Sequence, residues 1–396
     1  FRGSGSDHLV ASRLLAHLNY RGAHGFVGGE LLDARAWGAD SSTPLGTDDV
    51  NTLTPLQAYV GWRDSVAGGE LSLRAGRITE DMGSRRLLAR NRFRNTLNNF
   101  DGVSAHWKSA TGEGGWHGFW LMPIQRRPAA QARLMDNRRH SDRTLDDTHF
   151  WGIQRAVSGE TSSKELYLLG LRESDQSDVA TRDRDLTTAG FRLSKDVLTE
   201  EWGYELEAVW QFGHSRLGTA ANAPLLDHRA GFIHAHWLLP VGKEVASVLA
   251  LQFDYASGDR ADDGENNRFD TLYGARRFDF GPTGIYGPFS RSNILSPGVR
   301  WQFRASDLNG FVGYRAVWLA QTGDAHGSAG IGAENDERFA GHQLEARVRV
   351  PMWGEMVESL QWELGAALLI KGGAVDRAPG DPSPASYLYS QASYAF

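Results

Sequence analysis

The cationic residues are the ones whose type and spacing could do chemistry in this chain. Only five of its 42 basic residues are lysine (108, 164, 195, 243 and 371), so arginine supplies nearly all of the positive charge. A guanidinium group stays charged and binds carboxylate or phosphate through two parallel hydrogen bonds. Arginines placed around one bore would therefore favour anions, although a codon bias would give the same excess.

Nine arginines fall on the polar side of segments in which polar and apolar residues alternate. They are Arg13, Arg35, Arg63, Arg74, Arg192, Arg300, Arg304, Arg347 and Arg349. The same side carries acidic residues, namely Glu205, Glu207, Asp254, Glu345 and Glu363. Two interpretations follow from this mixture. The side chains could line the path of a solute, or they could form cross-strand ion pairs that stiffen a wall.

The most basic segment of the chain is the connection at residues 79–98. Its cations are Arg85, Arg86, Arg90, Arg92 and Arg94, separated by Leu87, Leu88 and Phe93. Mixed apolar and basic residues are typical of a segment that packs, so we predict that it folds inward and narrows a pore. The alternative is a surface loop that binds lipopolysaccharide phosphates. Arg77, just before it, falls on the apolar side, so we expect it to lie above a bilayer or to follow a bulge.

A second long connection, at about 259–295, begins acidic and ends in glycine, proline and aromatic residues. Its first part, 259–270, contains Asp259, Asp262, Asp263 and Glu265. These oxygens could bind Ca²⁺, but they lack the ordered spacing of a calcium loop, so solvated charge is the prediction and a Ca²⁺ site the alternative. No cofactor is expected. The compact second part could gate a channel.

Two further patterns bear on metal binding and catalysis. His234 and His236 are two apart on a predicted strand, so they share a face and could form half of a metal site. Local spacing supplies no third ligand, and no metal site is predicted. The sequence has no G-x-S-x-G, H-E-x-x-H or P-loop motif. We therefore expect no enzyme, with a Ser/His pair brought together by folding as the alternative.

The elements that must position these residues are β-strands, because alternation with a period of two recurs from one end of the chain to the other. We predict seventeen strands, at about 9–20, 25–37, 55–64, 69–78, 99–109, 115–125, 148–158, 163–174, 185–196, 202–214, 228–239, 244–258, 296–306, 309–322, 341–352, 359–372 and 386–396. Short connections alternate with mostly long ones. That asymmetry is typical of an outer-membrane β-barrel, with short periplasmic turns and longer outer loops.

The predicted fold is all-β, a transmembrane antiparallel up-and-down barrel formed by residues 1–396 as one domain. Bacterial barrels favour an even number of strands. Because the first and last predicted strands both run toward the periplasm, we hypothesise that one more strand precedes Phe1. This would give eighteen strands, with sixteen as the alternative. The chain ends in Tyr394, Ala395 and Phe396, and barrel-assembly machinery typically recognises such an aromatic C-terminus.

Composition agrees with a barrel and excludes other classes. Mean hydropathy is -0.42, and no apolar run is long enough for a membrane-spanning helix. A barrel tolerates this polarity because only alternate residues face lipid. The 46 glycines and the 13 Trp, 11 Tyr and 18 Phe suit turns and membrane interfaces. The absence of cysteine suits an oxidising periplasm, and a net charge of -6 argues against a nucleic-acid partner.

Several runs resemble the alginate-export family of outer-membrane barrels. They are LTPLQAYVGW ending at Trp62, LSLRAGRITEDMGSRRLLARNRFRNTLNNFDGVSAHW from Leu71, LQFDYASGD ending at Asp259, RFDFGPTGIYGPFSRSN ending at Asn293, and GHQLEARVRV from Gly341. The resemblance covers most of the chain. It implies an eighteen-stranded monomeric barrel with a positively charged lumen that passes anionic polysaccharide outwards.

Together these features predict a porin-like, anion-selective channel of a Gram-negative-type outer membrane. Its cargo would be an anionic or polar solute, with export of an anionic polysaccharide such as alginate as one form. Its other partners would be membrane lipid, lipopolysaccharide and, through Phe396, the assembly machinery. The alternatives are an uptake porin for nutrients or small molecules, and a plugged barrel that acts as an outer-membrane enzyme or in adhesion.

Overall fold

The chain forms one continuous antiparallel wall. A computed structural model describes residues 6–41, 45–176, 178–198, 201–242, 246–260, 264–275, 279–281, 289–305, 308–324, 334–351, 360–376 and 383–395. In these ranges, seventeen strands have ten or more residues. They are β1 (Val10–Arg21), β2 (Gly25–Trp37), β3 (Asn51–Val66), β4 (Gly69–Ile78), β5 (Phe100–Ser109), β6 (Gly114–Gln125), β8 (Thr148–Ser158), β9 (Ser162–Glu173), β10 (Asp185–Lys195), β11 (Gly203–Arg216), β12 (Leu225–Val241), β13 (Ala246–Ala256), β15 (Ile294–Ala305), β16 (Leu308–Trp318), β17 (Phe339–Pro351), β18 (Leu360–Lys371) and β19 (Ala385–Tyr394).

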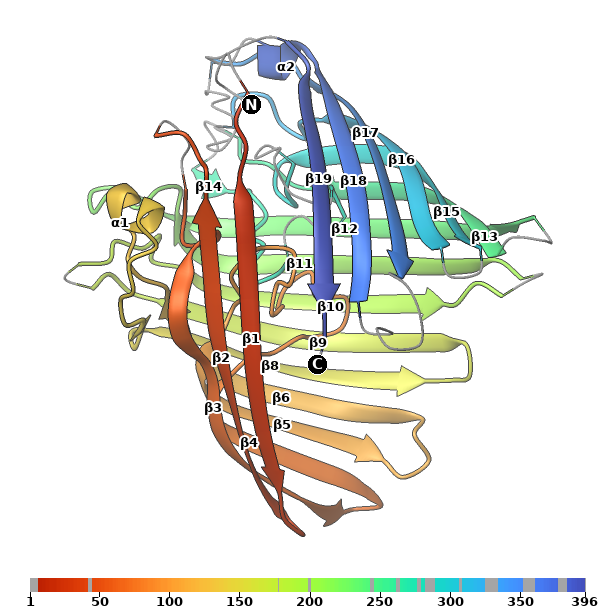
Figure 1. The fold of residues 1–396 in the computed structure, drawn as a ribbon. Coiled ribbons are helices and arrows are strands. Elements are labelled where there is room, and N and C mark those ends of the chain that lie inside the picture. The colour runs from red at the N-terminus through yellow and green to blue at the C-terminus, as the bar shows by residue number, and fades with distance from the viewer. Residues whose placement is uncertain are drawn as a thin grey trace.

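Each long strand pairs with the next one along the chain, so the wall is an up-and-down meander (Figure 1). The prediction of seventeen wall strands is confirmed. Sequence reading missed four short elements, which are the strands β7 (Arg143–Thr144) and β14 (Glu265–Asn266) and the helices α1 (Gln131–Met135) and α2 (Gly373–Asp376). They are too short to carry a periodic pattern.

The two ends of the meander are β1 and β19. Figure 1 shows both running in the same direction, as the odd number of alternating strands requires. No register joins these two strands over their described residues. An eighteenth strand before Phe1 stays a prediction. The assembly signal at Phe396 also stays one, since that residue lies outside the described ranges.

The alternation of the wall is inverted relative to a soluble protein. On β11, Trp210 is 55% exposed, whereas the next residue, Gln211, is only 2% exposed. The same pattern places Trp62, Trp120 and Trp301 on the outside. Apolar residues outside and polar residues inside is the arrangement that a lipid-embedded barrel requires. Among the described helices, none is both long and apolar enough to cross a membrane.

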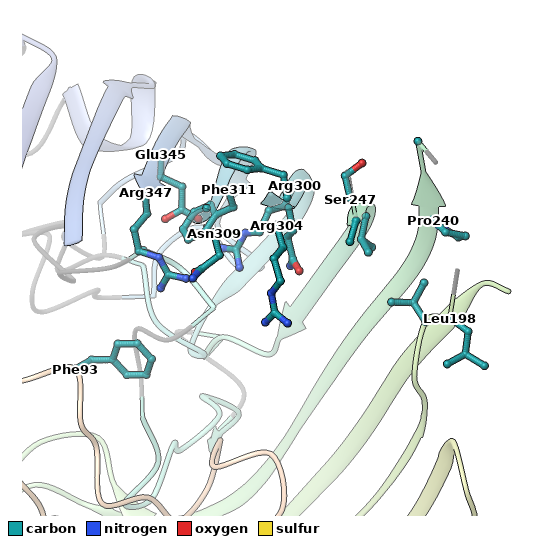
Figure 2. Close-up of a pocket in the computed structure, with 18 of the residues that line it drawn as sticks. Phe93, Leu198, Pro240, Ser247, Arg300, Arg304, Asn309, Phe311, Glu345 and Arg347 are labelled. Atoms are coloured by element: carbon teal, nitrogen blue, oxygen red, sulfur yellow. Dashed lines mark hydrogen bonds and ion pairs between the residues drawn. The ribbon is translucent and has the colours of Figure 1, made fainter. Parts of the chain in front are cut away.

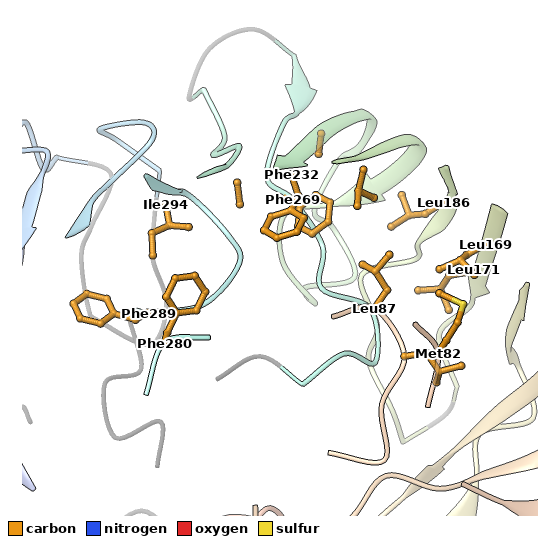
Figure 3. Packing of buried hydrophobic residues seen from close by; sticks show 14 of the residues in the cluster. Met82, Leu87, Leu169, Leu171, Leu186, Phe232, Phe269, Phe280, Phe289 and Ile294 are labelled. Carbon is orange, nitrogen blue, oxygen red and sulfur yellow. The ribbon is translucent and has the colours of Figure 1, made fainter. Parts of the chain in front are cut away.

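An apolar core lies inside the wall, where two long connections meet the strands (Figure 3). Met82 and Leu87 come from the connection after β4, and they join Leu169 and Leu171 of β9. Phe269, Phe280 and Phe289, from the connection between β13 and β15, belong to the same cluster. Burial of these side chains holds both connections within the barrel.

Candidate functional site: two inner loops and two arginine-lined cavities

Two connections fold into the barrel and bind each other. We call residues 79–98 the first inner loop and the described residues of 257–293 the second inner loop. The amide of Tyr273 donates to the carbonyl of Leu87 at 3.0 Å, and the amide of Ala275 donates to the carbonyl of Arg85 at 3.0 Å. The amide of Ala89 returns a bond to the carbonyl of Tyr273 at 3.2 Å. This main-chain pairing makes the two loops one unit.

The tight approach of the two loops depends on Gly274. A Cβ at this position would overlap the carbonyl oxygen of Arg86 and come within 2.9 Å of the amide nitrogen of Leu87. Both neighbours are main-chain atoms that cannot turn aside as a flexible side chain would. Glycine is therefore the residue that permits the pairing.

Arg86 fixes the first inner loop to the wall and to the second loop. Its side chain is 2% exposed. Nε donates to Asp279 Oδ2 at 2.9 Å, and Nη1 donates to Glu207 Oε2 at 2.8 Å and to Glu205. Arg291 donates to the same Asp279 at 2.7 Å. Charges this deeply buried require partners, so this network specifies where the loops sit.

The first cavity, at the end of the barrel that has the short turns, has a volume of about 1020 Å³. We call it the periplasmic cavity because short turns face the periplasm in such barrels. Its cationic lining residues are Arg85, Arg300, Arg304 and Arg347, and its one acidic lining residue is Glu345. Among the described lining residues, four positive charges therefore face one negative charge (Figure 2).

The arginines of the periplasmic cavity are held in different ways. Arg300 donates to Glu345 at 2.6 Å. The Phe311 ring lies 4.5 Å from the Arg300 guanidinium carbon and 4.8 Å from that of Arg347, so cation–π contacts orient both groups. Arg304 is exposed and has no ion-pair partner among the described residues. Figure 2 shows its side chain extending into the cavity.

The second cavity lies toward the long loops and has a volume of about 490 Å³. We call it the outer cavity. Its described lining contains Arg94, Arg126, Arg182 and Arg184 against Glu173 and Asp270, an excess of two positive charges among these residues. Burial would raise the pKa of Asp270, but Arg184 and Arg182 hold this pKa well below its ordinary value. Asp270 therefore stays ionised and fixes both guanidinium groups.

The first inner loop lines both cavities. Arg85 and Phe93 border the periplasmic cavity, whereas Asn91, Arg94 and Asn98 border the outer cavity. The loop thus lies along the axis between them. Two of its other predicted cations are paired, since Arg90 donates to Glu30 at 2.6 Å and Arg94 donates to Asp48 at 2.6 Å.

Most of the arginines singled out in the sequence lie on the inner side of the wall. Arg13 donates to the carbonyl of Arg94 in the first inner loop at 2.8 Å, and Arg192 donates to Glu165 at 2.6 Å. Arg349 pairs with Glu363, and Arg63 lies opposite Ser72. Many of these groups are in ion pairs. The inner face of this wall therefore carries both cross-strand ion pairs and arginines that border the cavities.

Arg35 is not on the inner face, and that prediction is wrong. Leu32 and Ala34 of β2 are the buried, inward residues, and they cluster with Leu97 of the first inner loop. Arg35 shares the opposite face with Asp33, to which its Nε donates at 2.9 Å. Because the inner loop covers this end of the strand, the inner face is apolar here and the usual alternation is reversed.

Arg77, which was predicted on the apolar side of its strand, is held by an ion pair. It follows Gly76, whose φ is 127°, and it donates twice to Asp101 on β5, at 2.9 and 3.0 Å.

The acidic part of the second inner loop forms bonds within the protein. Asp259 accepts a bond from the amide of Asn267, and Glu265 pairs with Arg229. Asp262 and Asp263 lie outside the described residues, and solvated charge in this segment stays a prediction.

Sequence reading missed the cluster of Glu80, His106 and His117, one of three groups of potential metal ligands among the described residues. Glu80 lies on the first inner loop, while His106 of β5 and His117 of β6 are directly opposite each other in register. Their ligand atoms all lie within 4.8 Å of one another. Because the three residues come from three elements, no local spacing pointed to them. The alternation of β5 and β6 indicated only that each histidine could face inward.

Comparisons with known proteins point to one family and one fold. A family model described as alginate export matches residues 2–387. No curated protein matches the chain. The solved structure of OccK1 (OpdK) from Pseudomonas aeruginosa is similar with a TM-score of 0.61 at 14% identity, covering 97% of this chain and 91% of that one. OccK9 (OpdG) of the same organism gives 0.61 at 14% identity, over 97% and 90%. OccK10 (OpdN), also from Pseudomonas aeruginosa, gives 0.53 at 15% identity, over 99% of each chain.

Proposed function

Because the chain belongs to the alginate export family and forms an outer-membrane channel, we propose that it passes anionic solutes through an arginine-lined lumen narrowed by the two inner loops. The observation that carries this proposal is the periplasmic cavity, whose described lining contains four arginines and one glutamate. A low-dielectric wall around an excess of fixed positive charge concentrates anions at the entrance.

The arginines contribute unequally to this proposed selectivity. Arg192 and Arg349 are in ion pairs with wall glutamates, so much of their field is cancelled locally. Arg300 is offset in the same way by Glu345. Of the wall arginines that line this cavity, Arg304 and Arg347 are the least offset, because Arg304 has no ion-pair partner among the described residues and Arg347 lies 4.0 Å from its nearest described carboxylate, that of Glu363. We propose that these two residues set the preference for anions.

The inner loops suggest the size of the cargo. In the described arrangement the first inner loop lies between the two cavities, and it is held there by Arg86 and by the pairing with Tyr273. This arrangement suits a small carboxylate better than a polymer. Small-solute passage is therefore our first candidate.

Export of an anionic polysaccharide is the second candidate, and the family membership favours it. For this cargo the joined inner loops would have to move away from the axis. Their attachments are hydrogen bonds, ion pairs and apolar contacts, with no cysteine in the chain to lock them. Movement of the loops is thus compatible with an intact wall.

Planar-bilayer recording of the purified protein tests the proposal. We expect the reversal potential in a KCl gradient to show preference for chloride, and a small sugar acid to lower the current in proportion to its concentration. A preference for potassium would overturn anion passage. Long, voltage-driven blockades by an anionic oligosaccharide, with passage to the other chamber, would favour the second candidate over the first.

A further inference from the structure

We propose that Glu80, His106 and His117 form a binding site for a divalent transition-metal ion of the zinc class. Two imidazole nitrogens and one carboxylate oxygen are ligands that such ions prefer. Glu80 belongs to the first inner loop, and the two histidines belong to neighbouring wall strands. A bound ion would therefore join the loop to the wall.

The separations of the three ligand atoms fit one ion. Glu80 Oε2 lies 3.6 Å from His106 Nε2 and 3.6 Å from His117 Nε2. These distances are too long for good hydrogen bonds. Ligands held tetrahedrally at 2.0–2.2 Å from zinc are about 3.3 to 3.6 Å apart. The two carboxylate–imidazole separations thus match the spacing of ligands around one ion, and all three ligand atoms lie within 4.8 Å of one another.

Burial supplies an independent argument. His117 is 7% exposed, and its Nε2 is buried with no hydrogen-bond partner in the described structure. A buried nitrogen without a partner is costly, and an ion would satisfy it. The His106 and His117 rings are stacked with centroids 3.9 Å apart. His106 is partly exposed, which leaves a side from which an ion can enter.

Arg74 orients the carboxylate and also limits the affinity. Its Nη2 donates to Glu80 Oε1 at 2.6 Å, so Oε2 is left for an ion. Such outer contacts commonly fix the orientation of a ligand. The same Nη2 lies 3.5 Å from His106 Nε2, and its positive charge opposes a cation. We therefore expect a site of moderate affinity that exchanges its ion readily.

A second cluster in the lumen makes an instructive contrast. His234, Asp254 and Asp279 also lie within range of one another. There, Arg315 donates to Asp254 at 2.7 Å, and Arg291 and Arg86 donate to Asp279. Guanidinium groups already take the carboxylates of that cluster. Glu205, His234 and His236 form a third such group, but Arg86 and Arg192 already donate to Glu205, and His236 Nε2 is bonded to Gln252. Among these three groups of described residues, the Glu80 cluster is the one whose carboxylate oxygen faces two histidine nitrogens without a guanidinium donor on that oxygen.

The proposed ion would act as a clamp on the first inner loop, and this consequence rests on the proposed channel function. Glu80 lies two residues beyond the end of β4, where the loop begins. Fixing this point to β5 and β6 would restrict movement of the whole loop. Metal binding itself does not depend on what the channel carries.

Metal titration of the full chain in detergent, after chelator treatment, tests the site. We expect Co²⁺ to give the visible absorption of a four-coordinate complex, with one ion per chain and displacement by Zn²⁺. The double variant His106→Gln/His117→Gln should weaken binding at least tenfold, and Glu80→Gln, which keeps the side-chain shape, should also weaken it. His140→Gln, at a partly buried histidine that belongs to none of the three clusters, is the matched control. Equal binding by the wild type and both site variants would overturn the proposal.

Bilayer recording tests whether a bound ion restricts the first inner loop, as distinct from whether the ion binds. Micromolar Zn²⁺ should reduce current fluctuations of the wild type and of His140→Gln, but not those of the double variant. Zinc binding without any effect on the current would overturn the clamp. Anion preference, measured in the same recordings without zinc, reports separately on the proposed function.

Discussion

Gly274 of the second inner loop lies against the main-chain carbonyl of Arg86 in the first, so closely that any side chain at position 274 would overlap it. The contact joins segments nearly two hundred residues apart in the chain. We predict that Gly274→Ala separates the loops, because overpacking of this kind costs about 1 to 3 kcal/mol. Single-channel recording should show more frequent or larger openings.

Gly218→Ala is the matched control for this substitution. A Cβ at Gly218 would meet nothing within 4 Å, and the residue does not have a positive φ. Both variants should assemble with unchanged wall strands, as judged by circular dichroism. If Gly274→Ala conducts like Gly218→Ala, the inner loops do not control the current.

Reversing the charge of Arg304 should lower anion selectivity. Arg304 faces the periplasmic cavity without an ion-pair partner among the described residues, so Arg304→Glu changes the local charge by two units without breaking a described pair. A unit charge at 4 Å contributes about 1 kcal/mol in water. We expect the permeability ratio of chloride to potassium to fall on the order of tenfold at low salt, and less at high salt because of screening.

Reversal potentials measure that ratio directly. Arg138→Glu is a suitable control because Arg138 lies exposed near α1, away from both cavities. An unchanged ratio in Arg304→Glu would mean that the cavity arginines are structural.

Removing the charge of Arg86 should destabilise the inner loops far more than the wall. Arg86→Met leaves Glu205, Glu207 and Asp279 without their shared partner. Breaking a buried pair from one side typically costs about 3 to 5 kcal/mol. We expect trypsin to cleave the first inner loop faster, while the barrel keeps its heat-modifiable migration. Slow cleavage equal to that of the wild type would contradict the assigned anchoring role.

One outer turn should loosen in acid. The amide of Thr181 donates to Asp175 at 2.7 Å and Arg216 donates at 2.9 Å, and these bonds lower the pKa of Asp175 to about 2. An unfolded aspartate titrates near 3.9. Because the folded pKa is the lower one, the stabilisation is fully present above about pH 4 and is lost as the pH falls through about 2.

Hydrogen-exchange protection of the Thr181 amide checks this pH dependence. Protection, corrected for the intrinsic exchange rate, should fall between pH 4 and pH 2 in the wild type. In Asp175→Asn it should already be low at pH 6. Asp227→Asn, at an exposed position, should behave like the wild type. Equal protection in Asp175→Asn at pH 6 would show that the carboxylate does not hold the turn.

The strands of the wall were predictable because the alternation that defines each of them lies within a short stretch of sequence. Each spanning strand must present apolar residues to lipid every second position, and that demand is visible in a single segment such as Tyr204 to Phe212. The short turns were predictable for the same reason. Two-residue strands such as β14 were not, because their pairing to β12 depends on a loop that returns from elsewhere in the chain.

The interior was less predictable because it depends on contacts between distant segments. Alternation placed Arg35 inside, but Leu97 of the inner loop covers that end of β2 and reverses its faces. The acidic partners of Arg86 lie on β11 and the second inner loop, more than a hundred residues away. Glu80 has no local pattern that pairs it with two histidines. Charge and residue type alone were enough to predict an anion path. The partners of Arg86 and Glu80 could be identified only from the folded chain.

The pairing of Leu88 with Tyr273 also sets an order for biogenesis. Neighbouring strands of the wall are close in sequence, so each hairpin can form in turn, and closing its loop costs little entropy. The joined loops need β4 through β15 in place before their main chains can meet. Maturation should therefore occur in two kinetic phases: a fast gain of far-ultraviolet β signal, and a slower change in aromatic signal as Tyr273 becomes buried.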